Sequence, residues 1–341
     1  MTGTSIPTRL TDRYGLTHPI ACAGMAFVTL SPRLPVAVCE AGALGAFAAG
    51  PFPPDFIRAN VTAIAEQTNG PVNLNFITPF ITDAHIELAA ELQPAVVQFH
   101  WALPPKDWVD RLHAAGVDVW HQVGSATDAQ RAVDLGVEGI IAQGLEAGGH
   151  CYGKLPLFAL LPAVLDAVGD TALVLAAGGI ADGRSMAGAL ALGADGVVVG
   201  TRLMATPEAD VADEYKQRIV AAGAQDTVLS SMFGRDMPDF NPMRLIRNAL
   251  VEEWHDKVDD IDAMGDREQP VIGTMELGSQ VMEMRRFSSL LPVQGATGDF
   301  DQMPLTAGQG LGVIHDIRPA GQVIEDMAAE AARALARIRA G

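Results

Sequence analysis

One histidine stands in a glycine-rich segment that is suited to proton transfer. Residues 139–153 read GIIAQGLEAGGHCYG, in which an apolar strand runs directly into a loop carrying Glu146 and His150. An imidazole exchanges protons near neutral pH, so His150 is a candidate base. A histidine that only bonds loop carbonyls is the alternative, and position alone does not decide between them. Cys151 follows His150, but no other residue supports a Cys–His nucleophile, and Glu146 is expected to brace the loop.

Two glycine motifs at the ends of consecutive strands predict a phosphate-binding site. Gly178 and Gly179 follow one buried strand, and Gly200 and Thr201 follow the next. Glycines let backbone amides approach an anion closely, and a helix that begins near Asp182 adds the positive end of its dipole. Tight turns without a ligand are the alternative, but the pairing of the two motifs favours phosphate.

Polar residues near other strand ends suit the edge of a bound ring. Asn73 and Asn75 lie in the expected strand 72–76 and share one face of it, because side chains alternate along a strand. Polar side chains in a buried strand need partners. Gly24 and Met25 follow the first expected strand. We therefore expect these residues to contribute to one binding site.

Histidines also end two of the strands. His100 ends the expected fourth strand, and His121 and Gln122 end the fifth. A group of histidines could suggest a metal site, but no matching carboxylates accompany them, so no metal is expected. Residues 306–310, TAGQG, form a glycine loop that either caps the phosphate or only turns the chain.

The elements that must position these residues alternate along the chain. Expected helices cover residues 53–68, 82–92, 105–115, 126–135, 155–168 and 182–192. The expected strands are residues 18–23, 44–48, 72–76, 95–100, 117–121, 138–142, 172–177 and 196–199. Eight parallel repeats predict an α/β fold of the (β/α)₈ TIM-barrel type, and a doubly wound sheet is the alternative.

The chain is longer than one barrel requires. Its 341 residues exceed the roughly 250 that such barrels typically take. We expect residues 1–202 and 304–341 to form the barrel. A smaller, mainly helical region at 203–303, inserted after the eighth strand, would cover the substrate side. The expected helices outside the repeats are residues 208–222, 241–256 and 323–340, and the acidic stretch 252–268 is expected to be a solvated face.

Composition excludes several partners. A net charge of −18 argues against nucleic acid and anionic membrane surfaces. Three scattered cysteines form no disulfide or zinc pattern, and neither a signal peptide nor a long apolar run is present. We expect a cytoplasmic protein that binds a small molecule. A homodimer remains open.

Several segments together resemble a known family. AQGLEAGGH, AAGGIADG, GADGVVVGT and LTAGQGLG resemble segments of the nitronate monooxygenase (2-nitropropane dioxygenase) family, and VAVCEAGALG and VVQFH fit the same pattern. The resemblance covers nearly the whole chain. Bacterial FMN-dependent enoyl-acyl-carrier-protein reductases and certain NADH:quinone reductases share the fold and several of these motifs. The resemblance implies an FMN-binding (β/α)₈ barrel without a metal.

The resemblance also implies roles for individual residues. His150 matches the base of the family, which removes the proton next to a nitro group or hydrogen-bonds a nitronate. Gly308 and Gln309 would close over the cofactor. The phosphate would be held by Gly178, Gly179, Gly200 and Thr201. The isoalloxazine ring and ribityl chain would be lined by Gly24, Met25, Asn73, Gln122, Gln143 and Gly148.

The implied activity is an FMN-dependent oxidation by O₂ of alkyl nitronates or nitroalkanes to a carbonyl compound and nitrite. The alternative is an NAD(P)H-dependent FMN reductase of an enoyl thioester or a quinone. No separate GxGxxG domain is present, so a nicotinamide would reach the flavin from the open mouth. A barrel that binds a phosphate ligand without turnover is a third hypothesis.

One departure from the family concerns the substrate. Cys151 and Tyr152 separate His150 from Gly153, whereas relatives usually have one residue in this place. The loop is therefore one residue longer beside the proposed base. This extra residue could shift His150 or place Tyr152 over the flavin.

Overall fold

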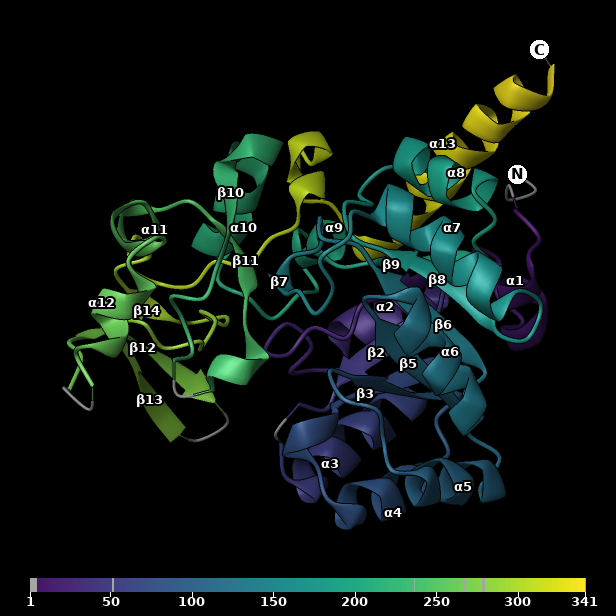
Figure 1. Ribbon diagram of the computed structural model, residues 1–341, viewed down its shortest axis with the longest axis horizontal. Helices are drawn as coiled ribbons and strands as arrows, with labels where there is room; N and C mark the ends of the chain where they lie inside the picture. Colours follow the sequence, from purple (N-terminus) through teal and green to yellow (C-terminus); the bar gives the residue numbers. More distant parts are fainter. Residues whose placement is uncertain (1–4, 51, 236, 266–267, 278–279, 341) are drawn as a thin grey trace.

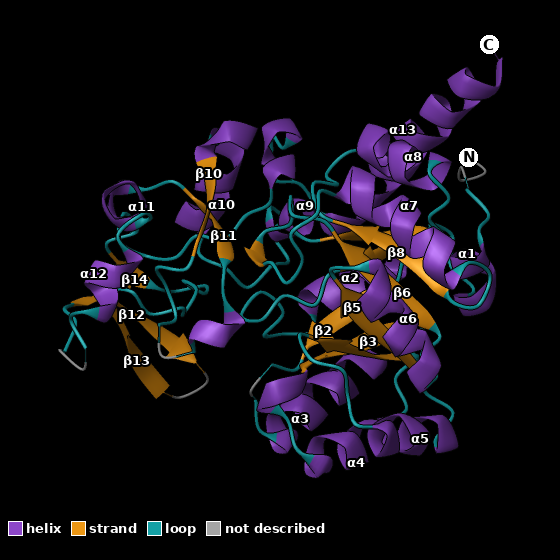
Figure 2. Cartoon of the chain, viewed as in Figure 1, coloured by secondary structure: helices purple, strands orange, loops and turns teal. Residues whose placement is uncertain are grey.

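In the computed structural model, eight parallel strands form a barrel surrounded by helices (Figures 1 and 2). The structure describes residues 5–50, 52–235, 237–265, 268–277 and 280–340. Neighbouring strands follow the order β1-β9-β8-β6-β5-β4-β3-β2. The strands are β1 (Ile20–Cys22), β2 (Gly45–Ala48), β3 (Val72–Ile77), β4 (Val96–His100), β5 (Asp118–Val123), β6 (Gly139–Gln143), β8 (Leu173–Ala177) and β9 (Gly196–Val199).

The ring closes between its first two strands. Cys22 N–H donates to Leu44 O at 2.9 Å, and Leu44 N–H donates to Ile20 O at 2.9 Å. All five residues of β8 are buried, as expected for a parallel strand with the barrel interior on one face and helices on the other. The eight strands coincide with the eight predicted ones, so the predicted fold class is confirmed.

Helices cover the outside of the barrel (Figure 2). Local signals define their ends: Ser125 accepts a hydrogen bond from Asp128 N–H at the start of α6, and Gly136 ends it in the left-handed conformation. These helices are α2 (Arg33–Glu40), α3 (Pro54–Ala65), α4 (Asp83–Leu92), α5 (Lys106–Ala114), α6 (Ala126–Leu135), α7 (Leu157–Val168), α8 (Gly183–Ala191) and α13 (Ala320–Ala340). Helix α13 packs against both α8 and α2, so the C-terminal segment returns to the barrel and completes its outer ring (Figure 1).

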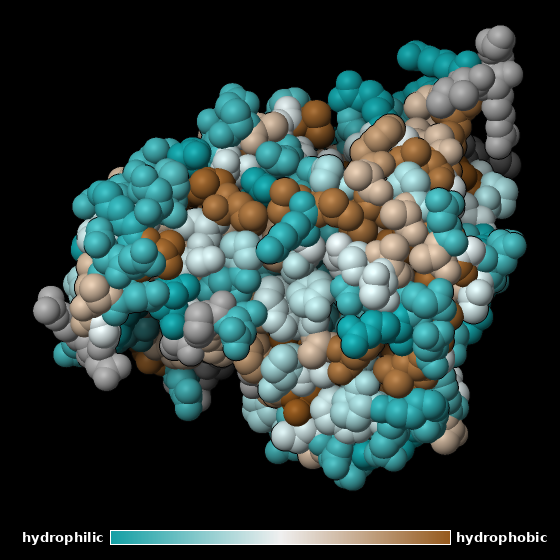
Figure 3. Space-filling view, viewed as in Figure 1, coloured by the Kyte–Doolittle hydropathy of each residue, from teal (hydrophilic) through white to brown (hydrophobic). Residues whose placement is uncertain are grey.

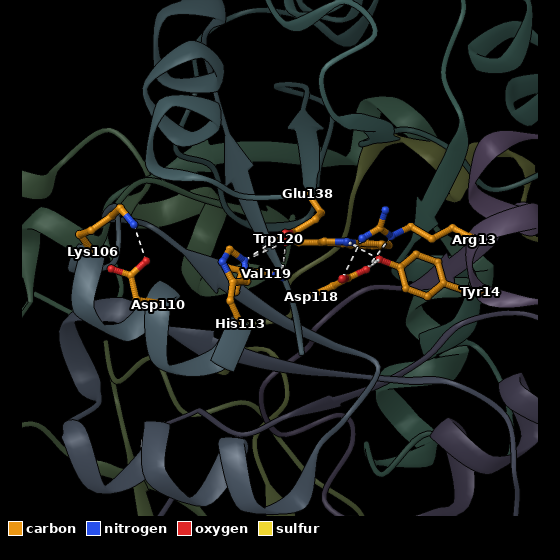
Figure 4. A network of polar contacts seen from close by, with 9 residues as sticks. All are labelled: Arg13, Tyr14, Lys106, Asp110, His113, Asp118, Val119, Trp120 and Glu138. Atoms are coloured by element: carbon orange, nitrogen blue, oxygen red, sulfur yellow. Dashed lines mark hydrogen bonds and ion pairs between the residues drawn. The ribbon is translucent and has the colours of Figure 1, made fainter. Parts of the chain in front are cut away.

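The N-terminal end of the barrel is closed by helix α1 (Arg9–Tyr14). Leu10 is fully buried and packs in one cluster with Val96, Trp120 and Ile141, which belong to three barrel strands. Around this cluster lies a network of polar contacts (Figure 4). In it the Asp118 carboxylate accepts from Arg13 Nε at 2.6 Å and from the Tyr14 hydroxyl at 2.6 Å.

The chain between β9 and α13 forms a mixed region beside the barrel (Figure 1). It contains helices, as expected, and also two small sheets ordered β10-β11-β7 and β13-β12-β14, in which β7 comes from the loop after β6. The helices and turns are α9 (Thr201–Met204), α10 (Asp213–Ala221), α11 (Ala249–Trp254), α12 (Val258–Asp262), η2 (Ala224–Asp226), η3 (Pro238–Phe240) and η4 (Gln309–Val313), with η1 (Thr78–Phe80) in the barrel. The strands are β7 (Gly149–His150), β10 (Thr227–Ser230), β11 (Met243–Ile246), β12 (Val271–Leu277), β13 (Gln280–Arg285) and β14 (Thr297–Gly298).

The helix predicted over 241–256 is wrong in its first half. Met243–Ile246 is a strand, and helix begins only at Ala249. The reason is tertiary, because β11 pairs with β10 on one edge and with β7 on the other. Strand pairing of this kind overrides a local apolar spacing that also fits a helix.

The surface is largely hydrophilic over the smaller region, and apolar residues gather in a band across the upper middle of the face in Figure 3. Large exposed apolar side chains include Leu155 and Phe158, which is 75% exposed. No helix in the described part of the chain combines the length and apolar character needed to cross a membrane.

Candidate active site

A cavity of about 330 Å³ lies at the C-terminal ends of the barrel strands. Ligand sites commonly have volumes of this order or larger, and catalytic sites in this fold lie at this end of the barrel. The mixed region contributes Met237, Phe240 and Met243 to its wall. Every described side chain that lines the cavity is uncharged, apart from two titratable histidines, His100 and His150. His150 and most of the predicted glycines are among the residues that line the cavity.

Glycine turns after β8 and β9 line this cavity. Gly178 and Gly179 have φ values of +106° and +72°, which residues other than glycine adopt only with strain. The N–H groups of Gly178, Gly179 and Gly200 donate to no acceptor among the described residues. Thr201 Oγ1 accepts from Gly308 N–H at 2.9 Å and ties the C-terminal loop to this turn. Such an array of amides is suited to an anion.

The start of helix α8 contributes less than the sequence predicted. Asp182 Oδ1 accepts from Ser185 N–H at 2.8 Å, and Gly183 N–H donates to Glu330 Oε2 at 2.8 Å. Carboxylates therefore already occupy the first amides of this helix. A phosphate bound at this place would therefore contact the loop amides after β8 and β9 rather than the first amides of α8.

Gly24 and Gly148 have no room for a side chain, because other atoms lie where a Cβ would stand. A Cβ at Gly24 would lie 2.2 Å from Asn75 Cγ, and one at Gly148 would lie 2.5 Å from Gly308 N. The absence of a side chain at Gly24 lets Asn75 occupy the mouth of the barrel. Asn75 Nδ2 is buried and has no partner among the described residues. A buried amide without a partner is a candidate ligand contact.

His150 lies on the short strand β7, which pairs antiparallel with β11 so that Met243 is opposite His150. The Phe240 ring lies against the imidazole, with 3.7 Å between ring centroids and a tilt of 38°. Burial lowers the pKa of His150 to about 4, and a backbone contact with Phe240 opposes the shift. The imidazole is therefore neutral at pH 7, and its Nδ1 atom has no described partner. A neutral imidazole can accept a proton or donate a hydrogen bond.

His100 on β4 also lines the cavity, and it contacts Gln122 on the neighbouring strand β5. Gln122 Nε2 lies 3.0 Å from His100 Nε2. Burial, together with the nearby His150 and His121, lowers the pKa of His100 to about 3. The side-chain amide of Gln122 is thus engaged with a histidine, although Gln122 also lines the cavity.

The extra loop residue leaves the cavity unobstructed. Cys151 is buried below the loop, its thiol lies 3.3 Å from Ala147 O, and burial raises its pKa to about 11. Tyr152 is 40% exposed, packs against Trp101 at 5.3 Å between ring centroids, and does not line the cavity. Gln143 bridges this turn, because its Nε2 donates to His150 O at 3.0 Å and its Oε1 accepts from Tyr152 N–H at 3.2 Å.

Most of the residues predicted for the site surround the cavity. Asn73 lies deeper in the barrel, where its amide donates to Gln98 Oε1 at 2.6 Å, and Asn75 takes its place at the mouth. Gln309 is exposed and lies outside the lining, while its neighbour Gly310 belongs to it. The predicted residues that line the cavity are Gly24, Met25, Gln122, Gln143, Gly148, His150, Gly178, Gly179, Gly200, Thr201 and Gly308.

Some lining residues were noted in the sequence without a fixed role, and others were not predicted. Asn75 was expected at the edge of a bound ring and His100 at a strand end, and each is the last inward-facing polar residue of its strand. Phe80, Phe240 and Leu290 come from turns and from the mixed region, where no local pattern marks a contact with the barrel mouth. Among the described residues, no three or more His, Cys, Asp or Glu side chains are grouped as a metal ion would require.

Comparison with known proteins identifies the family of the chain. The family model for nitronate monooxygenase matches residues 7–86 and 79–330. A Mycobacterium tuberculosis enzyme, (3aS,4S,5R,7aS)-5-hydroxy-7a-methyl-1-oxo-octahydro-1H-indene-4-carboxyl-CoA dehydrogenase, is 37% identical over 72% of this chain and 68% of its own length. A probable nitronate monooxygenase of Bacillus subtilis is 29% identical over 88% of this chain and 92% of its own.

Solved structures agree over nearly the full length. FabK from Thermotoga maritima superposes with a TM-score of 0.81 and 31% identity, covering 98% of this chain and 99% of its own. Nitroalkane oxidase from Streptomyces ansochromogenes gives a TM-score of 0.76 and 26% identity, covering 96% and 99%. With the family model matching nearly the whole chain and the barrel mouth built as described, the chain belongs to the nitronate monooxygenase family and is a flavin-dependent oxidoreductase of that type.

Proposed function

We propose that the chain binds FMN in the cavity and oxidises alkyl nitronates or nitroalkanes with O₂ to a carbonyl compound and nitrite. The observation that carries this proposal is the neutral imidazole of His150 in an uncharged cavity beside a set of free amides. His150 would accept the proton next to the nitro group, or donate a hydrogen bond to a nitronate.

The chain's residues fit the proposed cofactor. The unpartnered N–H groups of Gly178, Gly179 and Gly200 would hold the phosphate. Asn75, whose buried Nδ2 has no described partner, and Gln143 would meet the polar edge of the ring. When bound, FMN would supply the redox chemistry by taking two electrons from the substrate and passing them to O₂.

The protein's own contribution is then positioning and proton transfer. The cavity wall excludes charged groups, so a negative charge that develops on the substrate is stabilised by hydrogen bonds rather than by a cation. Phe240 keeps one face of His150 dry and fixes the ring. At neutral pH the imidazole is in the unprotonated form that a base requires, and its lowered pKa makes it a weaker base than an exposed histidine.

The test is anaerobic mixing of the FMN-loaded protein with propyl-2-nitronate. The yellow flavin absorbance should bleach, and the same mixture in air should release nitrite and acetone. No bleaching together with no nitrite would contradict the proposal.

A second candidate is a reductase that passes electrons from NAD(P)H to an enoyl thioester or a quinone. It is favoured by the relative from M. tuberculosis, whose name assigns it a CoA thioester substrate. In this case His150 would bind the carbonyl oxygen or donate a proton. Rapid bleaching by NADH or NADPH, with none by nitronates, would select this candidate.

A further inference from the structure

Arg244 is a buried cation next to the loop that carries His150. It lies on β11 and is 6% exposed. Its Nε and Nη2 atoms both donate to Leu145 O, at 3.1 Å and 2.9 Å. Its Nη1 atom donates to Thr227 Oγ1 at 3.3 Å. The side chain therefore joins the turn after β6 to the sheet of the mixed region.

This arginine departs from the usual pairing of buried charges, which carry an opposite charge beside them. Among the described residues, its guanidinium donates to the two oxygen atoms of Leu145 and Thr227 and forms no ion pair. The Glu146 carboxylate accepts from Leu157 N–H at 2.9 Å instead. A buried cation without a counter-ion costs stability, which favours a role in the site for the contact with Leu145 O.

The loop between Leu145 and His150 is attached to β11 at both of its ends. At one end β7 pairs with β11, so that Gly149 lies opposite Arg244. At the other end the Arg244 side chain holds Leu145 O through two N–H groups, and a planar guanidinium bound in this way fixes the direction of the carbonyl. Met243 lines the cavity and Arg244 does not, so the arginine supports the loop from outside the cavity.

The imidazole of His150 depends on this backbone for its place. Its Nδ1 atom has no described partner, and the ring packs against Phe240. Strand β7 is only two residues long, and Gly149, at φ +71°, restrains the backbone little. A base must lie within hydrogen-bond reach of the proton that it removes, so a small displacement of the ring is costly.

We propose that Arg244 is the positioning residue of His150. By holding the turn at Leu145, it keeps the imidazole where it can remove the proton next to a nitro group. The proton passes from the substrate carbon to the imidazole, and the electron pair of the broken C–H bond stays on the substrate as the nitronate. The proposal deepens the proposed function and rests on it for the reaction.

Two substrates separate this step from the rest of the reaction. Nitroethane must lose a proton, whereas ethyl nitronate has already lost it. With flavin saturating, Arg244→Met should slow anaerobic flavin reduction by nitroethane about tenfold or more and by ethyl nitronate about threefold at most. Arg244→Lys keeps the charge without the planar fork, so its rate ratio should lie between those of Arg244→Met and wild type. If the ratio of nitroethane to nitronate rate does not fall in Arg244→Met, the positioning role is wrong.

The thiol of Cys151 gives a second readout that needs neither flavin nor turnover. It is buried in the same loop, 3.3 Å from Ala147 O. In flavin-free protein, Arg244→Met should raise the rate at which N-ethylmaleimide labels Cys151 about fivefold or more, followed by mass spectrometry. Cys22 and Cys39, which are buried elsewhere, should keep their rates. The proposal requires both results, so an unchanged rate at Cys151, or an equal rise at all three thiols, would also overturn it.

Arg202→Met is the matched control. Arg202 is also buried, but it pairs with Asp316 at 3.1 Å and lies outside the lining of the active-site cavity. Its rate ratio and its labelling at Cys151 should match wild type. If Arg244→Met does not fold, Thr227→Val replaces it, because this variant removes one acceptor of the guanidinium and leaves Arg244 in place. The rate ratio should then fall about threefold, and an unchanged ratio would contradict the proposal.

Failure of the positioning role and failure of the proposed function give different results. If wild type is reduced by both compounds but Arg244→Met keeps the wild-type ratio, the activity stands and the positioning role falls. If wild type is reduced by neither compound, the proposed function falls, and the labelling of Cys151 alone decides whether Arg244 fixes the loop.

Discussion

The two ends of the barrel differ in the hydrogen-bond partners of their polar side chains. At the N-terminal end, polar side chains satisfy one another: Asp118 accepts from Arg13 and Tyr14, and Trp120 Nε1 donates to the Tyr14 hydroxyl at 3.0 Å (Figure 4). At the C-terminal end, His150 Nδ1 and Asn75 Nδ2 are buried without described partners. Buried polar groups normally have partners, so these two atoms, which belong to residues lining the cavity, are candidate ligand contacts.

This difference between the two ends predicts that substitutions there affect different properties. Substitutions at the closed end should lower the free energy of unfolding and leave flavin affinity unchanged. Substitutions at the open end should lower flavin or substrate affinity with less effect on the fold.

Gly179→Val should remove the cofactor and with it the activity. A branched side chain at φ +72° costs about 1–2 kcal/mol, and its Cβ would lie 3.2 Å from Glu146 Cβ beside the free amides. FMN affinity, measured by fluorescence titration, should fall at least about tenfold. The control is Gly116→Val, since Gly116 has φ +75° but no atom within 4 Å of the added Cβ. Equal loss of FMN affinity in both variants would contradict the assignment.

The pH profile of the reaction should reflect the lowered pKa of His150. The proposed base works when neutral, and burial keeps it neutral down to about pH 4. kcat/KM for nitroethane should therefore stay level between about pH 5 and pH 7, whereas an ordinary histidine would lose half its activity near pH 6.5. A midpoint near pH 6.5 would show that His150 is not the base or is not buried.

Asp118→Ala should destabilise the fold and spare the cofactor. Arg13 and the Tyr14 hydroxyl would lose their shared acceptor at the closed end of the barrel. The free energy of unfolding should fall by about 1–3 kcal/mol, measured by urea denaturation. Asp110→Ala removes the exposed ion pair with Lys106 in the same view and should cost less than about 1 kcal/mol (Figure 4). A change of FMN affinity in Asp118→Ala would break the separation between the two ends.

Cys151→Ala should have the smallest effect. The thiol is buried next to His150 but its raised pKa, about 11, leaves almost no thiolate at neutral pH. Steady-state rates should stay within about twofold of wild type, and stability should change by about 1 kcal/mol or less. A rate loss beyond tenfold would restore Cys151 as a participant in the chemistry.

The barrel could be predicted from the sequence because its signals are local. Runs such as Leu173–Ala177 are apolar throughout, and glycine turns end them at one edge. The mixed region could not be predicted in the same way. Met243–Ile246 becomes a strand only because β10 and β7 lie beside it, and those partners are distant in sequence.

The same distinction holds within the site. Glycine turns and His150 were predictable, since the motif itself fixes their place at a strand end. The choice between Asn73 and Asn75 depends on depth in the barrel, which alternation alone does not give. The role of Gln122 depends on a partner in the neighbouring strand, His100. Phe240 reaches His150 from a segment ninety positions further along the chain.

The most direct test of the account is anaerobic flavin reduction followed by stopped flow for wild type and His150→Ala. Nitroethane, ethyl nitronate, NADH and NADPH are compared as electron donors. We expect wild type to be reduced by nitroethane and ethyl nitronate, and we expect His150→Ala to keep its flavin but react with nitroethane about 10²–10⁴-fold more slowly. If His150→Ala matches wild type with every donor, the role of His150 in this site is wrong.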